Sequence, residues 1–384
     1  MKTSTIRNIL FLNRGSVLYG AETRMLDIIQ QLDRGAFKPF VMLPSPGPLS
    51  DILHEIGVEV IFCDFALKAN PSLTSIIKLN QEMFKVLKKY NIHILHFNMH
   101  FGISNLWPIM LFWHRRTVVH LRSHFWIYPL EKFLIYRCAK IITVSNYIKN
   151  DFLKPRRSDL CVFKQPHKVE TVYDGIDIKT FKPMTVTEGL RKEYNINANE
   201  KIVAVVGALH PVKGQNIVIE SAPMVLKEHP LTKILLIGGS YLNNGISLDY
   251  KNNLVKRIKE LGLEQSIILT GPRKHMPQIM NEIDILLQPS EHEALGTSMV
   301  EAMACQKPVI GSAVDGIPEV IGDDIAGYLL KERSPQELAR LISLLLSNST
   351  IALEKSQSGL KRVQDYFNIY KTIKDLENIY NVIK

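Results

Sequence analysis

The chain has 384 residues, of which 46% are hydrophobic and 22% are charged, and its formal net charge is +10. This composition is typical of a folded globular protein and excludes disordered, collagen-like and low-complexity classes, while the length predicts about two domains. The four cysteines show no Cys-x-x-Cys spacing, and no apolar run approaches the roughly 20 residues of a membrane-spanning helix, so we expect no disulfide framework, structural zinc site or transmembrane segment.

Short apolar runs alternate with helix-periodic segments through the first half of the chain. The strands expected there are Asn8–Asn13, Pro39–Leu43, Val58–Phe62, Ile92–Phe97, Thr117–Leu121 and Ile141–Val144. The helices expected between them are Ala21–Leu32, Leu49–Ile56 and Leu73–Lys89. The first apolar segment is too short for a signal peptide and is interpreted as a buried strand. This β-α-β alternation predicts a parallel sheet with helices on both faces.

The alternation restarts after a polar stretch, Asp174–Asn195, which predicts the linker. The strands expected beyond it are Lys201–Val206, Lys233–Ile237, Ile267–Leu269, Ile283–Leu287 and Pro308–Gly311. The helices expected there are Gln215–Lys227, Leu248–Leu261, Ser298–Ala304, Ser334–Ser347 and Glu354–Lys384. The pattern predicts an α/β protein of two doubly wound, Rossmann-like domains that face a cleft, residues 1–182 and 190–365. Ligands of such sheets bind at the carboxyl ends of the strands.

The excess positive charge lies entirely in the first half of the chain. Residues 1–184 contain 25 Lys and Arg against 14 Asp and Glu, whereas the remaining residues contain 22 and 23. This imbalance indicates either a domain that faces an anionic membrane or polyanion, or simply an unevenly charged surface. The densest basic stretch, Lys149–Lys168, includes Phe152 and Phe163 and suits a membrane interface or a solvated loop. No nucleic-acid-binding signature is present, so we expect no nucleic acid partner.

Two glutamates bracket the expected start of a helix in the second domain. Glu293 precedes the turn at Gly296, and Glu301 lies just over one turn inside the helix. A helix N-terminus is an anion site because its first N–H groups have no intrahelical partner. A carboxylate beside it can accept hydrogen bonds from sugar hydroxyls. Alone, a glutamate pair at this spacing is a weak signal, because surface glutamates are common.

Combined with other motifs, this stretch resembles the E-x7-E motif of the retaining nucleotide-sugar glycosyltransferases of family 4, which have the GT-B fold. The similarity covers nearly the whole chain, and the motifs occur in the same order. The other matching segments are Tyr19-Gly-Ala-Glu-Thr, Val144-Ser145, Val172 to Pro183, Val206 to Gly214, Ile237-Gly-Gly, Leu269 to Arg273, Asp315-Gly-Ile-Pro-Glu-Val-Ile and Gly327-Tyr-Leu-Leu. Asp315 stands where the family pattern has its first glycine. The resemblance implies that the final helix, residues 366–384, packs back on the first domain.

The resemblance implies roles for individual residues. The donor-binding residues that it implies are Gly20, Lys213, Arg273, Glu293, Ala294, Leu295, Gly296, Thr297 and Glu301, and the catalytic ones are His124, Lys213 and Glu293. Lys213 matches the lysine that neutralises the donor diphosphate. Glu301 matches the glutamate that binds the ribose hydroxyls, and Glu293 the one that touches the donor sugar. Gly20 matches a loop glycine that lets the backbone approach the phosphate, a space that a side chain would fill.

The sequence departs from the family pattern at the phosphate site, where Ala208 stands in place of an arginine. Either Lys213 and the helix N-terminus suffice, or another cation such as Arg273 or Lys274 helps. No Asp-x-Asp motif occurs, so the metal clamp of the other large glycosyltransferase fold is missing. We therefore expect no metal and no cofactor, with the leaving nucleoside diphosphate stabilised by Lys213 and helix N–H groups.

His124 aligns with the family histidine that lies near the reacting sugar. His96, His100 and His120 are close in sequence, and any of these histidines could instead be structural. Arg122 could pair either with an anionic acceptor or with an internal carboxylate, and the sequence leaves both open.

The resemblance implies transfer of a hexose from a UDP-sugar, or next a GDP-sugar, to a hydroxyl of a lipid-linked or polysaccharide acceptor, with retention of configuration. The expected location is cytoplasmic, at the inner face of the membrane. The alternatives are a nucleotide-sugar epimerase or hydrolase on the same fold, and a non-catalytic scaffold. The loop from Gly207 to Gly214 and the glutamate pair favour the transferase, whereas Ala208 favours the scaffold. No Gly-x-Gly-x-x-Gly follows the first strand, so a dinucleotide dehydrogenase is not expected.

Overall fold

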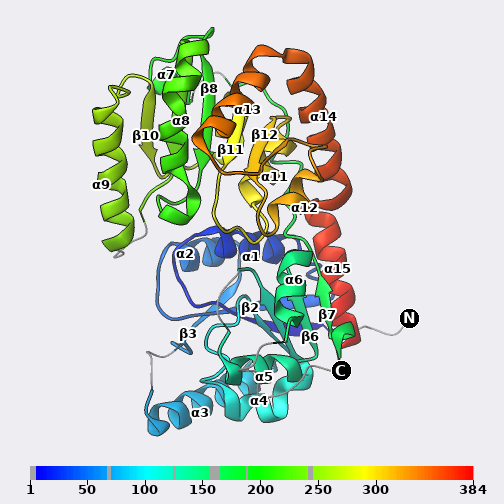
Figure 1. Cartoon of the computed structure of the whole chain (residues 1–384). Helices are drawn as coiled ribbons and strands as arrows, with labels where there is room; N and C mark the ends of the chain where they lie inside the picture. The colour runs from blue at the N-terminus through cyan, green and yellow to red at the C-terminus, as the bar shows by residue number, and fades with distance from the viewer. Residues whose placement is uncertain are drawn as a thin grey trace. The chain divides into compact units, whose positions relative to one another are not determined.

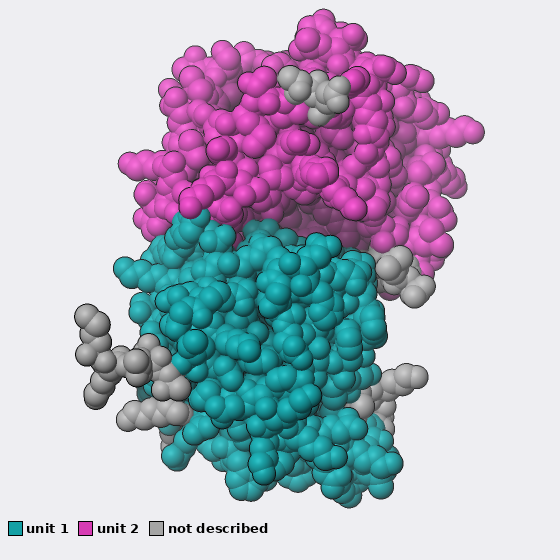
Figure 2. All heavy atoms as spheres, turned by 180° about the vertical axis from the view of Figure 1, so that it is seen from behind, with its two compact units in different colours: residues 1–174, 369–384 teal, residues 175–368 magenta. Residues whose placement is uncertain are grey.

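The computed structural model describes residues 6–66, 71–123, 127–155, 165–186, 189–240 and 245–383. The chain divides into two compact units, which are coloured separately in Figure 2. Unit 1 comprises residues 1–174 and 369–384, and unit 2 comprises residues 175–368. Each unit is built on its own sheet with helices around it (Figure 1). The prediction of two parallel-sheet, Rossmann-like α/β domains is confirmed.

Unit 1 contains a seven-stranded parallel sheet with the strand order β3-β2-β1-β4-β5-β6-β7. Its strands are β1 (Arg7–Leu12), β2 (Phe37–Leu43), β3 (Glu59–Phe62), β4 (Ile94–Phe97), β5 (Thr117–Leu121), β6 (Lys140–Thr143) and β7 (Val169–Thr171). Its helices are α1 (Gly20–Gln31), α2 (Pro48–Glu55), α3 (Leu73–Lys89), α4 (Trp107–Trp113), α5 (Pro129–Arg137), α6 (Asn146–Leu153) and α15 (Ile369–Val382), with 3-10 turns η1 (His114–Arg116) and η2 (Pro166–Lys168). The central strand β1 is buried along Ile9–Leu12, as expected of a strand covered on both faces.

Unit 2 contains a six-stranded parallel sheet with the strand order β10-β9-β8-β11-β12-β13. Its strands are β8 (Lys201–Val206), β9 (Thr232–Ile237), β10 (Ile267–Gly271), β11 (Ile285–Gln288), β12 (Val309–Ser312) and β13 (Tyr328–Leu330). Its helices are α7 (Leu190–Glu193), α8 (Gln215–Glu228), α9 (Gly245–Glu260), α10 (Met276–Glu282), α11 (Thr297–Ala304), α12 (Ile317–Ile321), α13 (Pro335–Ser347) and α14 (Ser349–Tyr366), with the 3-10 turn η3 (Pro211–Lys213). Helices α8 and α13 pack against each other and share one core with the central strands.

The prediction of one continuous helix over Glu354–Lys384 is wrong. The chain forms α14 and α15, and between them the backbone at Asn368 pairs with Ile176 as an isolated parallel bridge. Phe367 is fully buried, and its carbonyl accepts a hydrogen bond from the Ile176 N–H at 2.9 Å. The helix ends because this extended pairing replaces helical hydrogen bonds at the break. Beyond it, α15 packs against α1 and contributes to the unit 1 core.

Periodicity in the sequence did not reveal four of the short helices, α4, α5, α10 and α12. Each of them carries a proline in its first turn. A proline there loses no intrahelical hydrogen bond and favours a helix start, so these prolines were usable signals. Among the residues that the structure describes, no helix is both long and apolar enough to cross a membrane.

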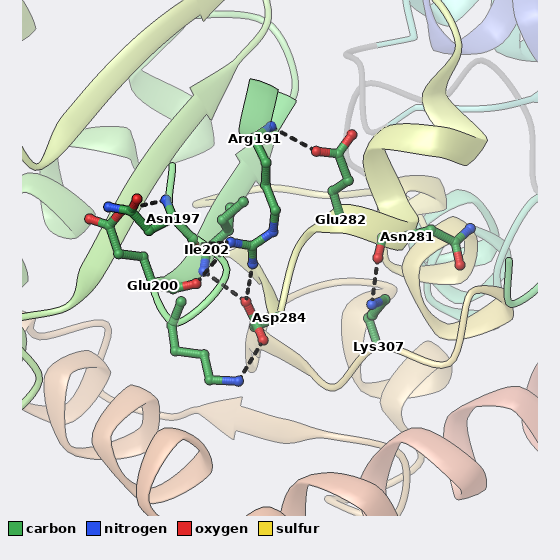
Figure 3. Close-up of polar contacts among 9 residues, drawn as sticks. Arg191, Asn197, Glu200, Ile202, Asn281, Glu282, Asp284 and Lys307 are labelled. Carbon is green, nitrogen blue, oxygen red and sulfur yellow. Dashed lines mark hydrogen bonds and ion pairs between the residues drawn. The ribbon is translucent and has the colours of Figure 1, made fainter. Parts of the chain in front are cut away.

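A charged cluster fixes α7 at the amino ends of the central strands of unit 2 (Figure 3). Asp284, just before β11, accepts hydrogen bonds from the Ile202 N–H at 2.8 Å and from Lys201 Nζ at 3.0 Å. Glu282 accepts hydrogen bonds from the backbone N–H groups of Leu190 and Arg191 at 3.0 and 2.8 Å, at the start of α7. The cluster satisfies backbone groups at the sheet edge opposite to the expected ligand edge, which indicates a structural role.

Candidate functional site

The carboxyl ends of β8 and β11 lie side by side in unit 2, because these two strands pair directly. The chain runs outward from β8 to β9 and β10 and then returns to β11 on the other side, which makes this boundary the switch point where ligands of open α/β sheets bind. Lys213 follows β8 and Glu293 follows β11. The Lys213 Nζ atom lies 2.6 Å from Glu293 Oε2. The structure therefore brings these two predicted residues together.

Two glycines allow the loops at this edge to pack closely. Gly214 has a φ of +70°, and a Cβ there would lie 2.1 Å from the Pro289 carbonyl oxygen. A Cβ on Gly316 would lie 2.0 Å from the Ala294 carbonyl oxygen. No side chain fits either distance, so both glycines are required by backbone packing alone. They fix the loop between β11 and α11 from two sides.

The Glu293 carboxylate is held by a second donor that the sequence analysis missed. Gln288, the last residue of β11, donates from Nε2 to Glu293 Oε2 at 2.5 Å, and its Oε1 accepts from Ser298 Oγ at 2.5 Å. A buried glutamine that ends an apolar strand was an available signal, because a buried amide needs partners. Both contacts to Glu293 fall on Oε2, which leaves Oε1 able to accept from a ligand.

Asp315 supports the same loop from the position where the family pattern has glycine. Its φ of +49° is in the left-handed region, which glycine, asparagine and aspartate tolerate best. Its Oδ2 accepts the Glu293 N–H at 3.0 Å and lies 3.1 Å from His292 Nδ1. The substitution thus keeps the backbone conformation of a glycine and adds a carboxylate that anchors the backbone of Glu293.

We expect Asp315→Ala to lower the free energy of unfolding of unit 2 by about 2 kcal/mol, since a charge-assisted hydrogen bond is lost and the left-handed φ remains. Asp315→Gly loses the same bond without backbone strain and is expected to cost about 1 kcal/mol less. Urea denaturation of the two variants measures the difference. Equal stability of the alanine variant and the unsubstituted protein would contradict this role.

The first turn of α11 lies next to this pair in sequence. Gly296 is the N-cap residue with a φ of +93°, preceded by Ala294 and Leu295 and followed by Thr297. The N–H groups of a first turn have no intrahelical acceptor, which favours an anion there. Glu301 lies on the same helix and is 9% exposed. Within the described ranges, no group of three or more His, Cys, Asp or Glu side chains is arranged to hold a metal ion.

Arg273 occupies a different pocket of unit 2, lined by the region around α7 and α10. Its guanidinium donates to both carboxylate oxygens of Glu193 at 2.8 and 2.7 Å and contacts the Tyr194 hydroxyl. Lys274 lines the same pocket. The hydrogen bonds of Arg273 thus go to α7 and its neighbour, and the structure does not join this residue to the Lys213–Glu293 pair.

Gly20 is the first residue of α1 in unit 1. A Cβ built there meets no heavy atom within 4 Å, so internal packing does not require glycine at this position. The preceding loop is held by Glu22, which accepts from the Tyr19 N–H at 3.3 Å and from Asn13 Nδ2 at 3.3 Å. The approach of a phosphate to this backbone therefore stays a prediction.

His124 lies outside the described residues. Its neighbour Arg122 lies in unit 1, directly after β5. Arg122 is buried and forms an ion pair with Asp174, which is 5% exposed. It also donates from Nε to Asn98 Oδ1 at 2.9 Å. Of the two readings left open by the sequence, the internal carboxylate is the one that the structure shows.

Three other histidines of unit 1, His96, His100 and His120, are buried. His96 Nδ1 lies 2.6 Å from the Tyr380 hydroxyl, and His120 Nδ1 lies 3.1 Å from Arg122 Nη2. Burial, together with the Arg122 charge, lowers the pKa of His96 to about 3 and holds the pKa of His120 well below its usual range. Burial and the Arg14 charge lower the pKa of His100 to about 4. These three side chains therefore belong to the core of unit 1.

The stability of unit 1 is expected to fall on mild acidification. In the unfolded chain these histidines take up a proton near pH 6.5, whereas in the folded chain they stay neutral, so the unfolded state binds more protons as the pH falls. The stabilisation is complete well above about pH 6.5, and below that pH it is lost with a slope that approaches about 1.4 kcal/mol per pH unit for each histidine. Urea denaturation between about pH 6.5 and pH 5.5 measures this slope, and His96→Gln is expected to flatten it. A free energy of unfolding that is constant over this interval would contradict the account.

The two Rossmann-like units and the cation–carboxylate pair at a switch point define a protein built like the two-domain nucleotide-sugar transferases. Two family models match the chain: "Glycosyltransferase Family 4" over residues 19–180 and "Glycosyl transferases group 1" over residues 186–362. The chain belongs to this glycosyltransferase family, as the sequence motifs indicate.

The chain is also similar to individual proteins. Spore coat protein SA of Bacillus subtilis is 29% identical over 253 residues, which are 63% of this chain and 64% of that protein. D-inositol 3-phosphate glycosyltransferase of Mycolicibacterium vanbaalenii is 29% identical over 199 residues, 50% of this chain and 43% of that protein. The chain thus matches less than two thirds of the length of these relatives. The solved structure of Anabaena HepE in complex with UDP and glucose has a TM-score of 0.81 at 23% identity and covers 97% of this chain and 99% of its own, which shows a shared fold.

Proposed function

We propose that the protein is a retaining glycosyltransferase that transfers a hexose from a nucleoside diphosphate sugar to a hydroxyl of a lipid-linked or polysaccharide acceptor. The observation that carries this proposal is the Lys213–Glu293 pair at the switch point of unit 2, directly before α11. A cation and a helix N-terminus suit a diphosphate, and a carboxylate suits sugar hydroxyls. One edge of the sheet therefore offers both kinds of contact that a nucleotide sugar needs.

In this proposal Lys213 and the N–H groups of residues 294–297 stabilise the charge on the leaving diphosphate without a metal ion. The bond between the anomeric carbon and the donor phosphate oxygen breaks, and its electron pair leaves with the diphosphate. The acceptor oxygen forms the new bond on the same face of the sugar, and its proton is released. Glu301 holds the ribose hydroxyls, and Glu293 holds the transferred sugar.

Before the donor binds, the positive charge of Lys213 is balanced by the negative charge of Glu293. When the diphosphate binds, Lys213 gains a more highly charged partner. Glu293 then accepts from sugar hydroxyls while Gln288 still holds its Oε2 atom. The remaining assignments rest on the motifs: the Gly20 backbone at a donor phosphate, His124 near the reacting sugar, and Arg273 as a further donor contact once it leaves Glu193.

UDP is the nucleotide that we propose first, and GDP the second. The family resemblance gives this order, and the solved structure of HepE is a complex with UDP and glucose. The basic composition of residues 1–184 supports an acceptor at an anionic membrane. We propose that the enzyme acts at the inner, cytoplasmic face of that membrane. The name of the mycobacterial relative adds a small phosphorylated polyol to the acceptors to be tested.

The test is release of nucleoside diphosphate from a panel of UDP- and GDP-hexoses, in EDTA, with and without candidate acceptors. We expect acceptor-dependent release with one donor, loss of activity in Glu301→Ala, and a product whose anomeric configuration, determined by NMR, matches the donor. Release without an acceptor would indicate a hydrolase, and isomerised donor an epimerase. A folded protein that consumes no donor would indicate a scaffold.

A further inference from the structure

One helix of unit 1 exposes large apolar side chains on a single face. On α4, the exposed fractions of Trp107, Leu111 and Phe112 are 38%, 44% and 83%. Trp107 and Leu111 are four residues apart, as are Pro108 and Phe112, so they form a continuous strip along the helix. The opposite face of α4, at Ile109 and Met110, is buried. Such a strip is costly in water unless something covers it.

Positive charge continues this strip by one further turn. Arg115 and Arg116 of η1 follow Leu111 and Phe112 by four residues, and both side chains are exposed. The Arg116 guanidinium lies over the Trp113 ring, with its carbon 5.6 Å from the ring centre. Apolar side chains that end in arginines beside an aromatic ring match the boundary between acyl chains and lipid headgroups.

The neighbouring helix α3 repeats the same combination. Leu73, Ile77 and Phe84 are 65%, 47% and 58% exposed, and their spacing places them within about 40° of one another around the helix. The buried Asn80 joins the two helices by donating to the Asn105 carbonyl at 2.8 Å and accepting from the Ile109 N–H at 3.2 Å. Figure 1 shows α3 and α4 gathered at the same end of unit 1.

The surrounding sequence is almost free of negative charge. Residues 65–130 contain eight Lys and Arg, of which Arg122 is buried, and a single acidic residue, Glu82, while Asp64 and Glu131 flank this stretch. Glu82 precedes Phe84 by two positions and therefore points away from the apolar stripe of α3. Lys88 and Lys89 end the same helix. The face is thus complementary in both polarity and charge to an anionic lipid surface.

We propose that this face, defined by Trp107, Leu111, Phe112, Arg115 and Arg116 with the α3 stripe beside it, docks the protein on an anionic bilayer. The inference deepens the proposed function, because it rests on an acceptor held at a membrane and names the surface that reaches it. The apolar strip inserts at the headgroup boundary, and the arginines bind lipid phosphates. A second copy of the chain does not fit this face, since it would bring together two sets of like charges.

The test is cosedimentation of the full chain with vesicles of phosphatidylcholine, with or without phosphatidylglycerol. We expect binding to the anionic vesicles that weakens with salt, and little binding to phosphatidylcholine alone. The double variant Arg115→Glu/Arg116→Glu is expected to bind at least tenfold more weakly, and Leu111→Glu/Phe112→Glu likewise, because each removes one of the two contributions. The matched controls are Lys227→Glu/Lys256→Glu and Ile325→Glu/Leu353→Glu, which alter exposed residues of unit 2 and are expected to bind as the unsubstituted protein does.

The outcomes separate this inference from the proposed function. Absence of binding to anionic vesicles, or equal binding by the face variants and the controls, would overturn the docking surface. A change of oligomeric state in Leu111→Glu/Phe112→Glu, seen by light scattering, would assign the face to a second copy instead. Thermal melting of each variant verifies that it is folded. Vesicle binding without sugar transfer would support the docking surface and contradict the proposed function. Sugar transfer to a water-soluble acceptor without vesicle binding would support the transferase and contradict the docking surface.

Discussion

Replacing Lys213 with alanine is expected to lower kcat/KM for the nucleotide sugar by about a thousandfold, the size of effect seen when one donor to a developing negative charge is removed. The effect is large because Ala208 stands where the family pattern has a second cation. The expected loss appears in kcat, since the charge on the diphosphate grows as the anomeric bond breaks.

The matched control for Lys213→Ala is Lys227→Ala, an exposed lysine on α8 of the same unit. Its kinetics are expected to remain unchanged. Lys213→Arg keeps the positive charge but changes the length and shape of the side chain. Its kcat/KM is expected to lie between that of Lys213→Ala and that of the unsubstituted protein. Glu293→Gln distinguishes the contributions of the two ion-pair partners, because it removes the carboxylate charge and leaves Lys213 in place. A Lys213→Ala enzyme with an unchanged kcat/KM would place the phosphate site elsewhere.

Arg122→Ala is expected to lower the free energy of unfolding of unit 1 by about 3–5 kcal/mol, the cost of leaving one partner of a buried ion pair uncompensated. Asp174 would keep a buried charge, and Asn98 would lose the donor to its Oδ1 atom. Because a protein of two units need not unfold in a single step, denaturation is followed with a probe in each unit.

The double variant Arg122→Ala/Asp174→Ala supplies the control for the ion pair. Removing both charges leaves no uncompensated charge, although Asn98 still lacks its donor, so part of the lost stability is expected to return. Arg122→Lys is expected to retain little of the stability that Arg122 provides, since an ammonium group cannot contact Asp174, Asn98 and His120 at the same time. A double variant as unstable as the sum of the single variants would show that the pair is not coupled.

The sequence motifs assigned Lys213 and Glu293 to one site through the family resemblance. The pairing of β8 with β11, which the strand pattern alone does not give, brings the two side chains together in the structure. The pairing of Gln288 with Glu293 could not be predicted in this way, because it depends on side-chain directions at the strand end. The anchoring role of Asp315 required its φ angle and its distance to Glu293.

Other features depended on contacts between residues distant in the sequence. The break between α14 and α15 arises from the pairing of Asn368 with Ile176, almost two hundred positions earlier, and helix periodicity carries no sign of it. The ion-pair partner of Arg122, Asp174, is 52 positions away in the sequence, and no local pattern points to it. Trp107 and Phe112 belong to an apolar run of the sequence, but only the fold shows that their side chains lie at the surface.

The central claim is that the carboxyl ends of β8 and β11 in unit 2 bind a nucleotide sugar through Lys213 and Glu301. The most direct test measures the melting temperature of the purified protein in EDTA with UDP, GDP, ADP or CMP added. Ligand that binds only the folded state raises the melting temperature by mass action. We predict a rise with one nucleoside diphosphate, UDP first, that disappears in Lys213→Ala and in Glu301→Ala. No rise with any nucleotide, or a rise that both variants keep, would contradict the claim.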